Sequence, residues 1–320
     1  MYNNRSKLKG SISLVVIVGL VTAALAGSYF YLDHQADSRT TETMTSLVAQ
    51  AESQGVALSY ASVDASPLNQ TVKITDFAII GNQQEPDIRL GNVVMKGFSW
   101  QDLNNNQNSL PAEMSIDIKG GELHIKKSLS ETSTDLQTLV RIFGDTIPFS
   151  TKVTYNLDPT EKLLKLSLTQ TVEENFFFDG NVTLGNMVWL TVMDRQQTQM
   201  PAEAMESTLN TLSLSYKNTG LIEKIRADIS RQSGQTNEQL IEQSIAQLKQ
   251  LQMTAAQQWG PIFTPFIDEM IKFSREPKQL KLSIDPLQPL TGNDFMMTFM
   301  GGESNLIKLI ANARIQLKAN

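Results

Sequence analysis

An uncharged, apolar run near the start of the sequence constrains this chain more than any other feature. No charged residue occurs between Lys9 and Asp33. A helix over residues 11–32 is long enough to cross the hydrocarbon core of a bilayer, which takes about 20 residues. Basic residues precede the run and acidic residues follow it, so we expect residues 1–10 in the cytoplasm and the remainder outside it. The side chains expected at the outer membrane interface are those of Tyr29, Phe30 and Tyr31.

A cleaved signal peptide is the alternative interpretation of this run. Ala24-Leu25-Ala26 has the small residues of a cleavage site, and residues 12–23 would form the apolar core of the signal. The apolar run continues past that site to Leu32, which favours a retained transmembrane helix. Both interpretations export the rest of the chain. We expect a single-pass protein of a bacterial inner membrane, with its N-terminus in the cytoplasm and its C-terminal domain in the periplasm.

The composition of the 320-residue chain argues against several kinds of chemistry. A formal net charge of −6 disfavours nucleic acid as a partner, because binding phosphates needs clustered Lys and Arg. Without cysteine there is no disulfide, thiolate nucleophile, iron–sulfur cluster, Cys-ligated zinc or lipid-carrying cysteine. A mean hydropathy of −0.19 argues against several membrane spans. We therefore expect no cofactor and no nucleic-acid partner.

Hydrophobic periodicity predicts an α+β fold for the exported part. A helix over residues 33–55 is expected to continue the membrane span outward, and residues 56–320 form the exported domain. Alternating apolar and polar residues predict strands, and recurrence at helical spacing predicts a helix-rich C-terminal third. The expected parts of the domain are β-units over 56–126 and 149–217, a helical part over 220–275 and closing strands over 278–318.

The two β-units are predicted to be antiparallel. The first is a meander of about five strands, in which Lys119-Gly120-Gly121 predicts a hairpin. In the second, Asp158-Pro159 and Asp179-Gly180 predict turns, and apolar residues as far as Val192 predict a strand. A helix over 130–144 is expected between the units.

Boundary signals divide the helical part. A helix over 221–231 is predicted to end near Gly234, and Thr236 with Gln239 three residues on predicts a capping box for the next helix. A last helix over 304–310 and a strand over 313–317 close the chain. The apolar stripe predicted for the long helix after Thr236 consists of Ile241, Ile245, Leu248, Leu251, Ala255 and Trp259.

One short pattern recurs in both β-units. Leu90-Gly91-Asn92 and Leu184-Gly185-Asn186 lie 94 residues apart. A duplicated β-unit and a coincidence between amphipathic strands both explain the recurrence, and the sequence leaves the two explanations open.

Patterns that would indicate catalysis or metal binding are scarce. His34 and His124 are the two histidines, and each is expected at a surface. No P-loop, glycine-rich dinucleotide motif or nucleophile elbow is present. Glu173, Glu174 and Asp179 have the oxygens to bind a cation, but neighbouring acids in a turn are usually solvated. We therefore expect no catalytic residue and no metal site, while a hydrolase with a carboxylate pair stays open, since such pairs assemble in space.

Three consecutive aromatic residues, Phe176, Phe177 and Phe178, are the candidate ligand-binding residues. In a strand, Phe176 and Phe178 face one way and Phe177 the other, so one of these faces meets something apolar outside the core shared by the other. Cover by a helix would satisfy that need, and so would a lipid-lined groove or a partner interface. The apolar run over 295–300 likewise suits either irregular core or an adaptable surface.

Four segments between the apolar run and Ile125 carry a family resemblance. They are Ser66-Pro67-Leu68 and residues 72–79, 88–94 and 121–125. This plan resembles the N-terminal part of AsmA-like bacterial envelope proteins, and YdgA-like proteins share the single anchor and the exported β-rich domain. The resemblance covers about a third of the chain and includes no catalytic signature. It implies a curved sheet that holds lipid acyl chains; the short chain and its helical last third depart from a bridge between membranes.

The leading functional hypothesis is a membrane-anchored, periplasm-facing, non-enzymatic envelope protein that binds lipid or another apolar ligand on a sheet face. Its expected partners are the membrane, through residues 11–32, and lipid or other envelope proteins. A scaffold or assembly factor of an envelope or secretion complex is the alternative. A carboxylate-based hydrolase ranks behind both, because no sequence feature favours it.

Overall fold

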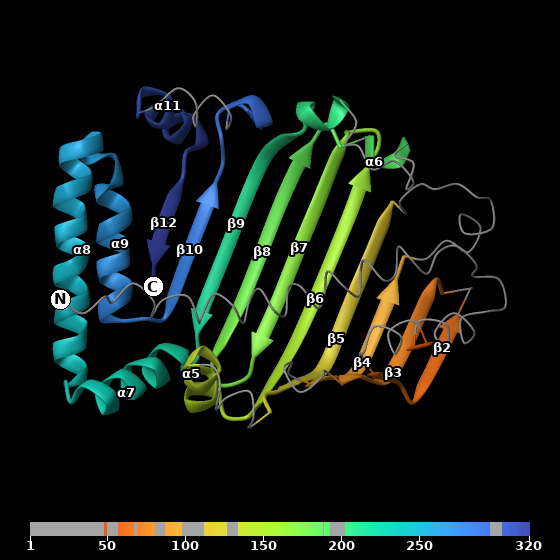
Figure 1. Ribbon diagram of the computed structural model, residues 1–320. Coiled ribbons are helices and arrows are strands. Elements are labelled where there is room, and N and C mark those ends of the chain that lie inside the picture. Colours follow the sequence, from red (N-terminus) through yellow and green to blue (C-terminus); the bar gives the residue numbers. More distant parts are fainter. Residues whose placement is uncertain are drawn as a thin grey trace. The chain divides into compact units, whose positions relative to one another are not determined.

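The computed structural model describes most of the chain from residue 57 onward (Figure 1). These residues form a mixed α+β fold, with an antiparallel meander of strands and helices in the C-terminal part, which confirms the expected fold class at this level. The described residues are 48–49, 57–66, 69–80, 87–97, 112–126, 134–187, 189–192, 202–294 and 303–320.

Several predictions concern residues outside these ranges. The apolar run over 11–32, the aromatic residues Tyr29, Phe30 and Tyr31, and the run over 295–300 are among them. Of the helix expected over 33–55, Val48 and Ala49 are described, and both are helical. Within the described ranges, no helix has the length and apolar character needed to span a membrane.

The chain divides into two compact units, and the division passes through β6 (Thr146–Asp158) and β7 (Leu163–Val172). The first unit contains the described residues up to 154 together with 170–172, and the second contains 155–169 and the described residues from 173 onward. The other elements of the first unit are β1 (Ala57–Ser59), β2 (Ser62–Ser66), β3 (Thr71–Ile80), β4 (Asp87–Lys96), β5 (Glu113–His124) and α5 (Thr134–Phe143).

The second unit combines strands with most of the helices that the structure describes. Its strands are β8 (Phe176–Gly185), β9 (Thr208–Asn218), β10 (Gln279–Ile284), β11 (Leu290–Thr291) and β12 (Gln316–Ala319). Its α-helices are α6 (Trp189–Val192), α7 (Leu221–Ser233), α8 (Asn237–Trp259), α9 (Thr264–Arg275) and α11 (Glu303–Ala313), and its 3-10 helices are η2 (Ala202–Glu206) and η3 (Gly260–Phe263).

The strand order follows the sequence, as expected for a meander. Hydrogen-bonded neighbours succeed one another as β1-β3-β4-β5-β6-β7-β8-β9-β10-β12, while β2 pairs with β3 and β11 pairs with β9. The short β1 and β2 both pair with β3, one with each half of it.

Three neighbouring strands of the first unit invert their side-chain alternation at one level. The registers of β3 with β4 and of β4 with β5 bracket Asp76, Gly91 and Gly120 at this level. Asp76 and Gly120 have φ values of 50° and 62°, in the left-handed region that glycine adopts freely. The pairing is kept, so the buried set of each strand moves by one residue there. The buried residues are Val72, Ile74, Val93, Met95, Met114, Ile116 and Ile118 on one side of the level and Phe77, Leu90, Gly121 and Leu123 on the other.

The predicted hairpin at Lys119-Gly120-Gly121 is therefore wrong. β5 runs through these residues as one strand, because Gly120 uses its positive φ to invert the alternation and not to reverse the chain. The described part of residues 56–126 contains five strands, the number predicted. The agreement arises because the two strands of the wrong hairpin are one strand, β5, while β2 was not predicted as a separate strand.

Phe149 of β6 packs on Gly121 in the core of the first unit. A Cβ atom at Gly121 would lie 2.6 Å from Cε2 of Phe149, so the glycine provides the space that the ring occupies. Phe149 is 3% exposed. An aromatic ring that covers a glycine in a neighbouring strand restores the apolar contact that the glycine lacks.

The second unit corrects two predictions and confirms a third. Asp179-Gly180 is not a turn, because β8 continues through it from Phe176 to Gly185. The strand expected to reach Val192 ends at Gly185, and residues 189–192 are the short helix α6. The turn at Asp158 is confirmed: its Oδ1 accepts hydrogen bonds from the backbone amides of Thr160 and Glu161, at 2.9 and 3.0 Å.

Helix boundaries agree well with the sequence signals. α7 ends at Gly234, which has a φ of 71°, and the capping box of α8 is present. In that box Gln239 N donates to Thr236 Oγ1 at 3.3 Å, and Thr236 N donates to Gln239 Oε1 at 2.8 Å. α5 stops before Gly144, close to the predicted end. The closing helix α11 reaches Ala313, so the last strand begins at Gln316 and not at 313.

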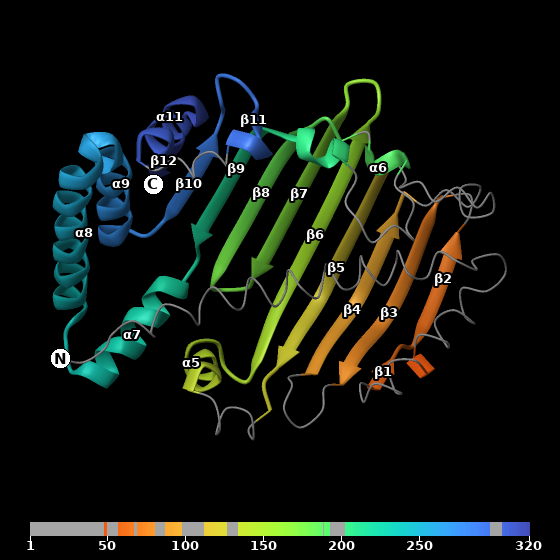
Figure 2. The same cartoon turned by 45° about the horizontal axis from the view of Figure 1, so that its top comes forward.

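The packed stripe of α8 differs from the prediction at one position. α8 and α9 lie side by side in both views (Figures 1 and 2). Leu251 is 54% exposed, whereas Gln252 is half-buried and its Nε2 donates to Asp268 Oδ1 of α9 at 2.9 Å. A polar pair thus takes the place in the helix contact that the sequence suggested for a leucine.

Candidate functional site

Aliphatic side chains line one side of the strands in the second unit. The registers place Val182 of β8 opposite Leu212 of β9, and Leu214 of β9 opposite Leu282 of β10. Leu166 of β7 packs into the same cluster as Leu184 of β8, which assigns β7 residues to this side. We call the half-buried residues here the aliphatic face: Leu166, Leu168, Phe178, Val182, Leu212, Leu214, Leu282 and Ile284.

The opposite side of the same strands is polar. Thr169 Oγ1 of β7 donates to Asp179 Oδ1 of β8 at 3.2 Å, and Asn181 Nδ2 donates to the other oxygen of Asp179 at 2.8 Å. Gln279 Nε2 of β10 donates to Ser215 Oγ of β9 at 3.1 Å. Cross-strand hydrogen bonds of this kind suit a solvated surface, so the two sides of the strands face different environments.

One end of the aliphatic face is closed by a small core. Leu157, Leu164 and Met187 are buried there, and Trp189 of α6 packs against them. The Trp189 ring is held in place because its Nε1 donates to Ser207 Oγ at 2.9 Å.

Aromatic rings close the other end. Phe176 is 2% exposed, and the centroid of its ring lies 5.8 Å from that of Tyr216. The ring of Phe273 on α9 meets Tyr216 edge to face, with 6.1 Å between the two ring centroids. Burial raises the pKa of the Tyr216 hydroxyl well above its usual range, and the negative charge of Glu223 raises it further. Tyr216 is therefore a neutral packing residue that donates to Asn218 Oδ1 at 3.4 Å.

Between these closed ends the aliphatic face is half-exposed. Gly180 lies in its centre, where a Cβ atom would be 3.2 Å from both Phe178 Cε1 and Leu214 Cδ2. Phe178 thus folds along its own strand over the glycine. Adjacent half-exposed aliphatic side chains on a side that carries no charged residue are typical of a surface that meets another apolar group.

The structure separates the three predicted phenylalanines. Phe176 belongs to the closed aromatic end, Phe178 to the centre of the aliphatic face, and Phe177 to the polar side, opposite Lys217. Phe178 is the one whose position suits contact with a ligand. A ligand-binding role for the three stays a prediction.

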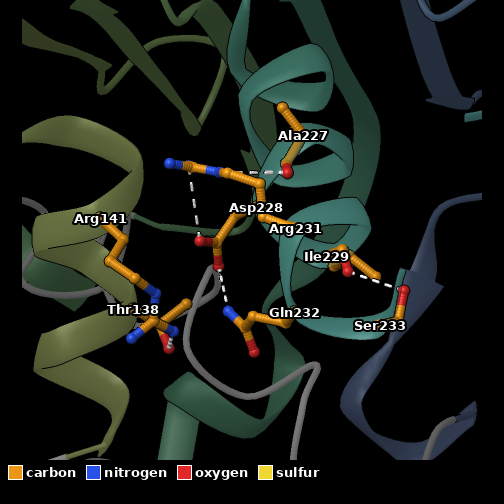
Figure 3. A network of polar contacts seen from close by, with 8 residues as sticks. All are labelled: Thr138, Arg141, Ala227, Asp228, Ile229, Arg231, Gln232 and Ser233. Atoms are coloured by element: carbon orange, nitrogen blue, oxygen red, sulfur yellow. Dashed lines mark hydrogen bonds and ion pairs between the residues drawn. The ribbon is translucent and has the colours of Figure 1, made fainter. Parts of the chain in front are cut away.

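A buried carboxylate on α7 is accounted for by its neighbours (Figure 3). Asp228 is 3% exposed, and Gln232 Nε2 donates to its Oδ2 at 2.6 Å. Arg231 Nη2 lies 3.7 Å from its Oδ1, and Arg231 Nε donates to Ala227 O at 3.4 Å. Burying a carboxylate costs free energy unless hydrogen-bond donors and charged partners surround it, so these contacts give Asp228 a structural role in α7.

A second polar anchor ties the start of α7 to the turn before β8. Asn175, which is 4% exposed, accepts a hydrogen bond from Lys224 Nζ at 3.0 Å through its Oδ1. Its backbone oxygen accepts from Thr219 N and Leu221 N, at 2.9 and 3.0 Å. The start of the helix is thereby fixed to the closed aromatic end.

The polar residues singled out in the sequence are placed as follows. His124 is half-buried and not free in solvent: its Nδ1 lies 3.0 Å from Thr146 Oγ1, and its Nε2 lies 2.9 Å from Glu122 Oε2. Glu173 and Glu174 are exposed in the turn before β8. In the parts of the chain that the structure describes, no three His, Asp or Glu side chains gather in a way that could hold a metal ion.

Comparison with known protein families adds one match. Residues 169–320 match a family model. Its description is "Uncharacterized protein". The matched part runs from the end of β7 to β12, so it contains all of the aliphatic face except Leu166 and Leu168. No curated protein matches the sequence of this chain.

Sequence reasoning did not identify Leu214 and Leu282 as site residues. Both were recognised as alternating strand residues, but alternation in one strand does not say which strand lies beside it. The signal that was available is that β7, β9 and β10 alternate aliphatic residues mainly with Ser, Thr or Lys, and that β8 does so over Val182-Thr183-Leu184.

Proposed function

We propose that this chain is a membrane-anchored, periplasm-facing envelope protein that holds a lipid acyl chain or another apolar ligand on its aliphatic face. The observation that carries the proposal is the half-exposed strip between two closed ends, centred on Phe178 and Leu214. The apolar run over 11–32 supports the anchoring, because a single membrane helix would keep this face near a source of lipid.

The chemistry of the face supports an apolar ligand over a polar one. Each methylene group that leaves water contributes about 0.8 kcal/mol, so an acyl chain gains binding energy along its length without any polar partner. The aliphatic face contains no charged or hydrogen-bonding side chain that would orient a polar substrate. This also supports binding in place of catalysis, since a reaction would need polar groups close to the ligand.

Native mass spectrometry of the full-length chain in a mild detergent tests this proposal. The wild-type chain is expected to retain lipid, and V182T/L214N is expected to lose most of it, because both changes add polar atoms to the centre of the aliphatic face. T183V/S213A changes the polar side of the same two strands and serves as the matched control, which should retain lipid like the wild type. Absence of lipid from the wild type, or equal retention in V182T/L214N, would contradict the proposal.

A further inference from the structure

A groove in the second unit lies outside the aliphatic face. It runs between α9 and the junction of α11 with β12, and its volume is about 970 Å³. Figures 1 and 2 show α9 beside β12 and α11 at the end of that strand. The volume is within the range of about 300–1,000 Å³ that small-molecule sites occupy. No residue that lines this groove belongs to the aliphatic face.

The walls of the groove are mostly apolar. η3 and α9 supply one wall, and the end of α11 with the start of β12 supplies the other. The apolar lining residues are Ile262, Pro265, Phe266, Ile271, Ile310, Ala311, Ile315 and Leu317.

The two acidic residues of the groove already have partners. Glu269 Oε1 accepts a hydrogen bond from Lys272 Nζ, and its Oε2 accepts one from the backbone amide of Ala319 at 2.7 Å. Asp268 Oδ1 accepts from Gln252 Nε2 at 2.9 Å. Both oxygens of Glu269 and one oxygen of Asp268 are therefore engaged within the protein.

Two cationic residues at the same groove are not engaged in this way. Arg314 and Lys318 line the groove and are exposed. Among the residues that the structure describes, neither forms an ion pair. Lys318 acts on Glu269 through its charge alone, and Lys272 is occupied by Glu269. The groove thus combines apolar walls with two cationic side chains, Arg314 and Lys318, that can form ion pairs with an anionic ligand.

We infer that this groove binds a long-chain carboxylate, with the acyl chain between η3, α9 and α11 and the carboxylate at Arg314 and Lys318. A guanidinium binds a carboxylate through two parallel hydrogen bonds, and an ammonium adds a second charge. The single groove suits a ligand with one chain. The two sites share no residue, and they adjoin where Leu317 of the groove pairs with Leu282 of the aliphatic face.

Photolabelling of the full-length chain in phosphatidylcholine nanodiscs tests the inference. The probe is a palmitate analogue with a diazirine in its chain, and its matched control is the alcohol of the same length with the same diazirine. The palmitate analogue is expected to label peptides from 262–271 and 310–318, and to label them at least about tenfold more than the alcohol, because a charge-assisted hydrogen bond is worth roughly a factor of ten in affinity. Equal labelling by the alcohol, or the absence of adducts from these two peptides, would overturn the inference.

A charge variant adds a second readout. R314N/K318Q removes both cations, and Asn suits position 314 because Arg314 has a φ of 47° and Asn tolerates the left-handed region. It should label at least about tenfold less than the wild type, whereas K165Q, which removes an exposed lysine of β7 that does not line the groove, should label like the wild type. Unchanged labelling of R314N/K318Q would overturn the inference.

Competition with a membrane lipid is a further test. Suppression of palmitate labelling by added phosphatidylglycerol would also overturn the inference, because it would assign the groove to a membrane lipid. The comparison of acid with alcohol needs no variant, so it holds even where R314N/K318Q fails to fold.

Discussion

The carboxylate of Glu269 on α9 accepts a hydrogen bond from the backbone amide of Ala319 in β12, with 2.7 Å between Oε2 and N. β12 stands at the end of the strand order and pairs with β10 through its other side. The bond therefore satisfies an amide that faces away from the strand partner, at an edge that would otherwise be open to pairing with another chain. A side chain of a helix here takes the place of a further strand.

We expect this contact to make the stability of the β12 edge depend on pH. Hydrogen bonds from Lys272 and then from Ala319, with the charges of Lys272 and Lys318, lower the pKa of the Glu269 carboxyl from its usual 4.5. A carboxyl whose pKa is lower in the folded chain stabilises the fold above its unfolded pKa, and this stabilisation is lost as the pH falls through the folded pKa. E269Q should therefore unfold at lower urea concentration than the wild type at pH 7, and the difference should shrink as the pH falls below 4.5.

Amide hydrogen exchange gives the same contact a local readout. E269A should speed the exchange of the Ala319 amide, and E269Q, which keeps an acceptor oxygen, should speed it less. The control is E276Q in the exposed Glu276–Lys278 ion pair, which should leave exchange at Ala319 unchanged. Equal exchange in all three variants would show that Glu269 does not hold the edge.

A buried hydroxyl in β6 should cost stability. Thr151 is 2% exposed, and its Oγ1 has no hydrogen-bond partner in the described part of the chain. T151V keeps the shape and removes the unsatisfied group, so it should raise the free energy of unfolding by about 1 kcal/mol. T169V makes the same change where the hydroxyl donates to Asp179, and it should lower that free energy. Urea unfolding of both variants checks the prediction, and a loss of stability in T151V would contradict it.

The close contact between Phe149 and Gly121 should make β5 intolerant of a larger residue. A Cβ atom at Gly121 would lie 2.6 Å from the ring, so G121A should lower the free energy of unfolding by about 1–3 kcal/mol. F149L shortens the side chain, so the cost of G121A should be smaller in that background, which a double-mutant cycle measures. G292A is the control, because its nearest atom would be 3.7 Å away, and it should not destabilise the chain. An equal cost of G121A in both backgrounds would refute the contact.

The absence of native cysteine makes the proposed orientation directly testable. In intact cells whose outer membrane has been permeabilised, a membrane-impermeant maleimide should label Q257C, since Gln257 is exposed on α8. S6C lies before the apolar run, so the maleimide should label it only after the cells have been lysed. The wild-type chain is the blank for both. Labelling of S6C in intact cells, or protection of Q257C, would reverse the orientation that the charges around the run predict.

The sequence predicted the elements of this fold better than it predicted their continuity. Helix ends were readable because Gly234 and the Thr236–Gln239 pair act through local backbone geometry. Gly120 and Gly180 were misread as turns. Gly120 inverts the alternation and Gly180 makes room for the ring of Phe178, and neither role can be told from a hairpin glycine in the sequence alone. Which of these a glycine does depends on the neighbouring strands, at Gly91 and Leu214 respectively.

The candidate site was harder to predict for the same reason. Phe178 was named because its position in an aromatic run is unusual, but its neighbours Leu214 and Leu282 come from strands 36 and 104 residues further on in the numbering. Their common side follows from register, which is set by the whole meander. The groove cations Arg314 and Lys318 carried no sequence signal, because isolated basic residues are ordinary on a protein surface.

Photocrosslinking from one strand tests the central claim most directly. p-Benzoylphenylalanine is placed at position 214 on the aliphatic face or at position 213 on the polar side, in the full-length chain in cells, and the adducts are identified by mass spectrometry. We predict lipid adducts from position 214 and none from position 213, because adjacent strand residues point to opposite sides. A protein adduct from position 214 would favour the scaffold hypothesis. No lipid adduct at 214, or equal lipid adducts at both positions, would contradict a lipid-binding aliphatic face.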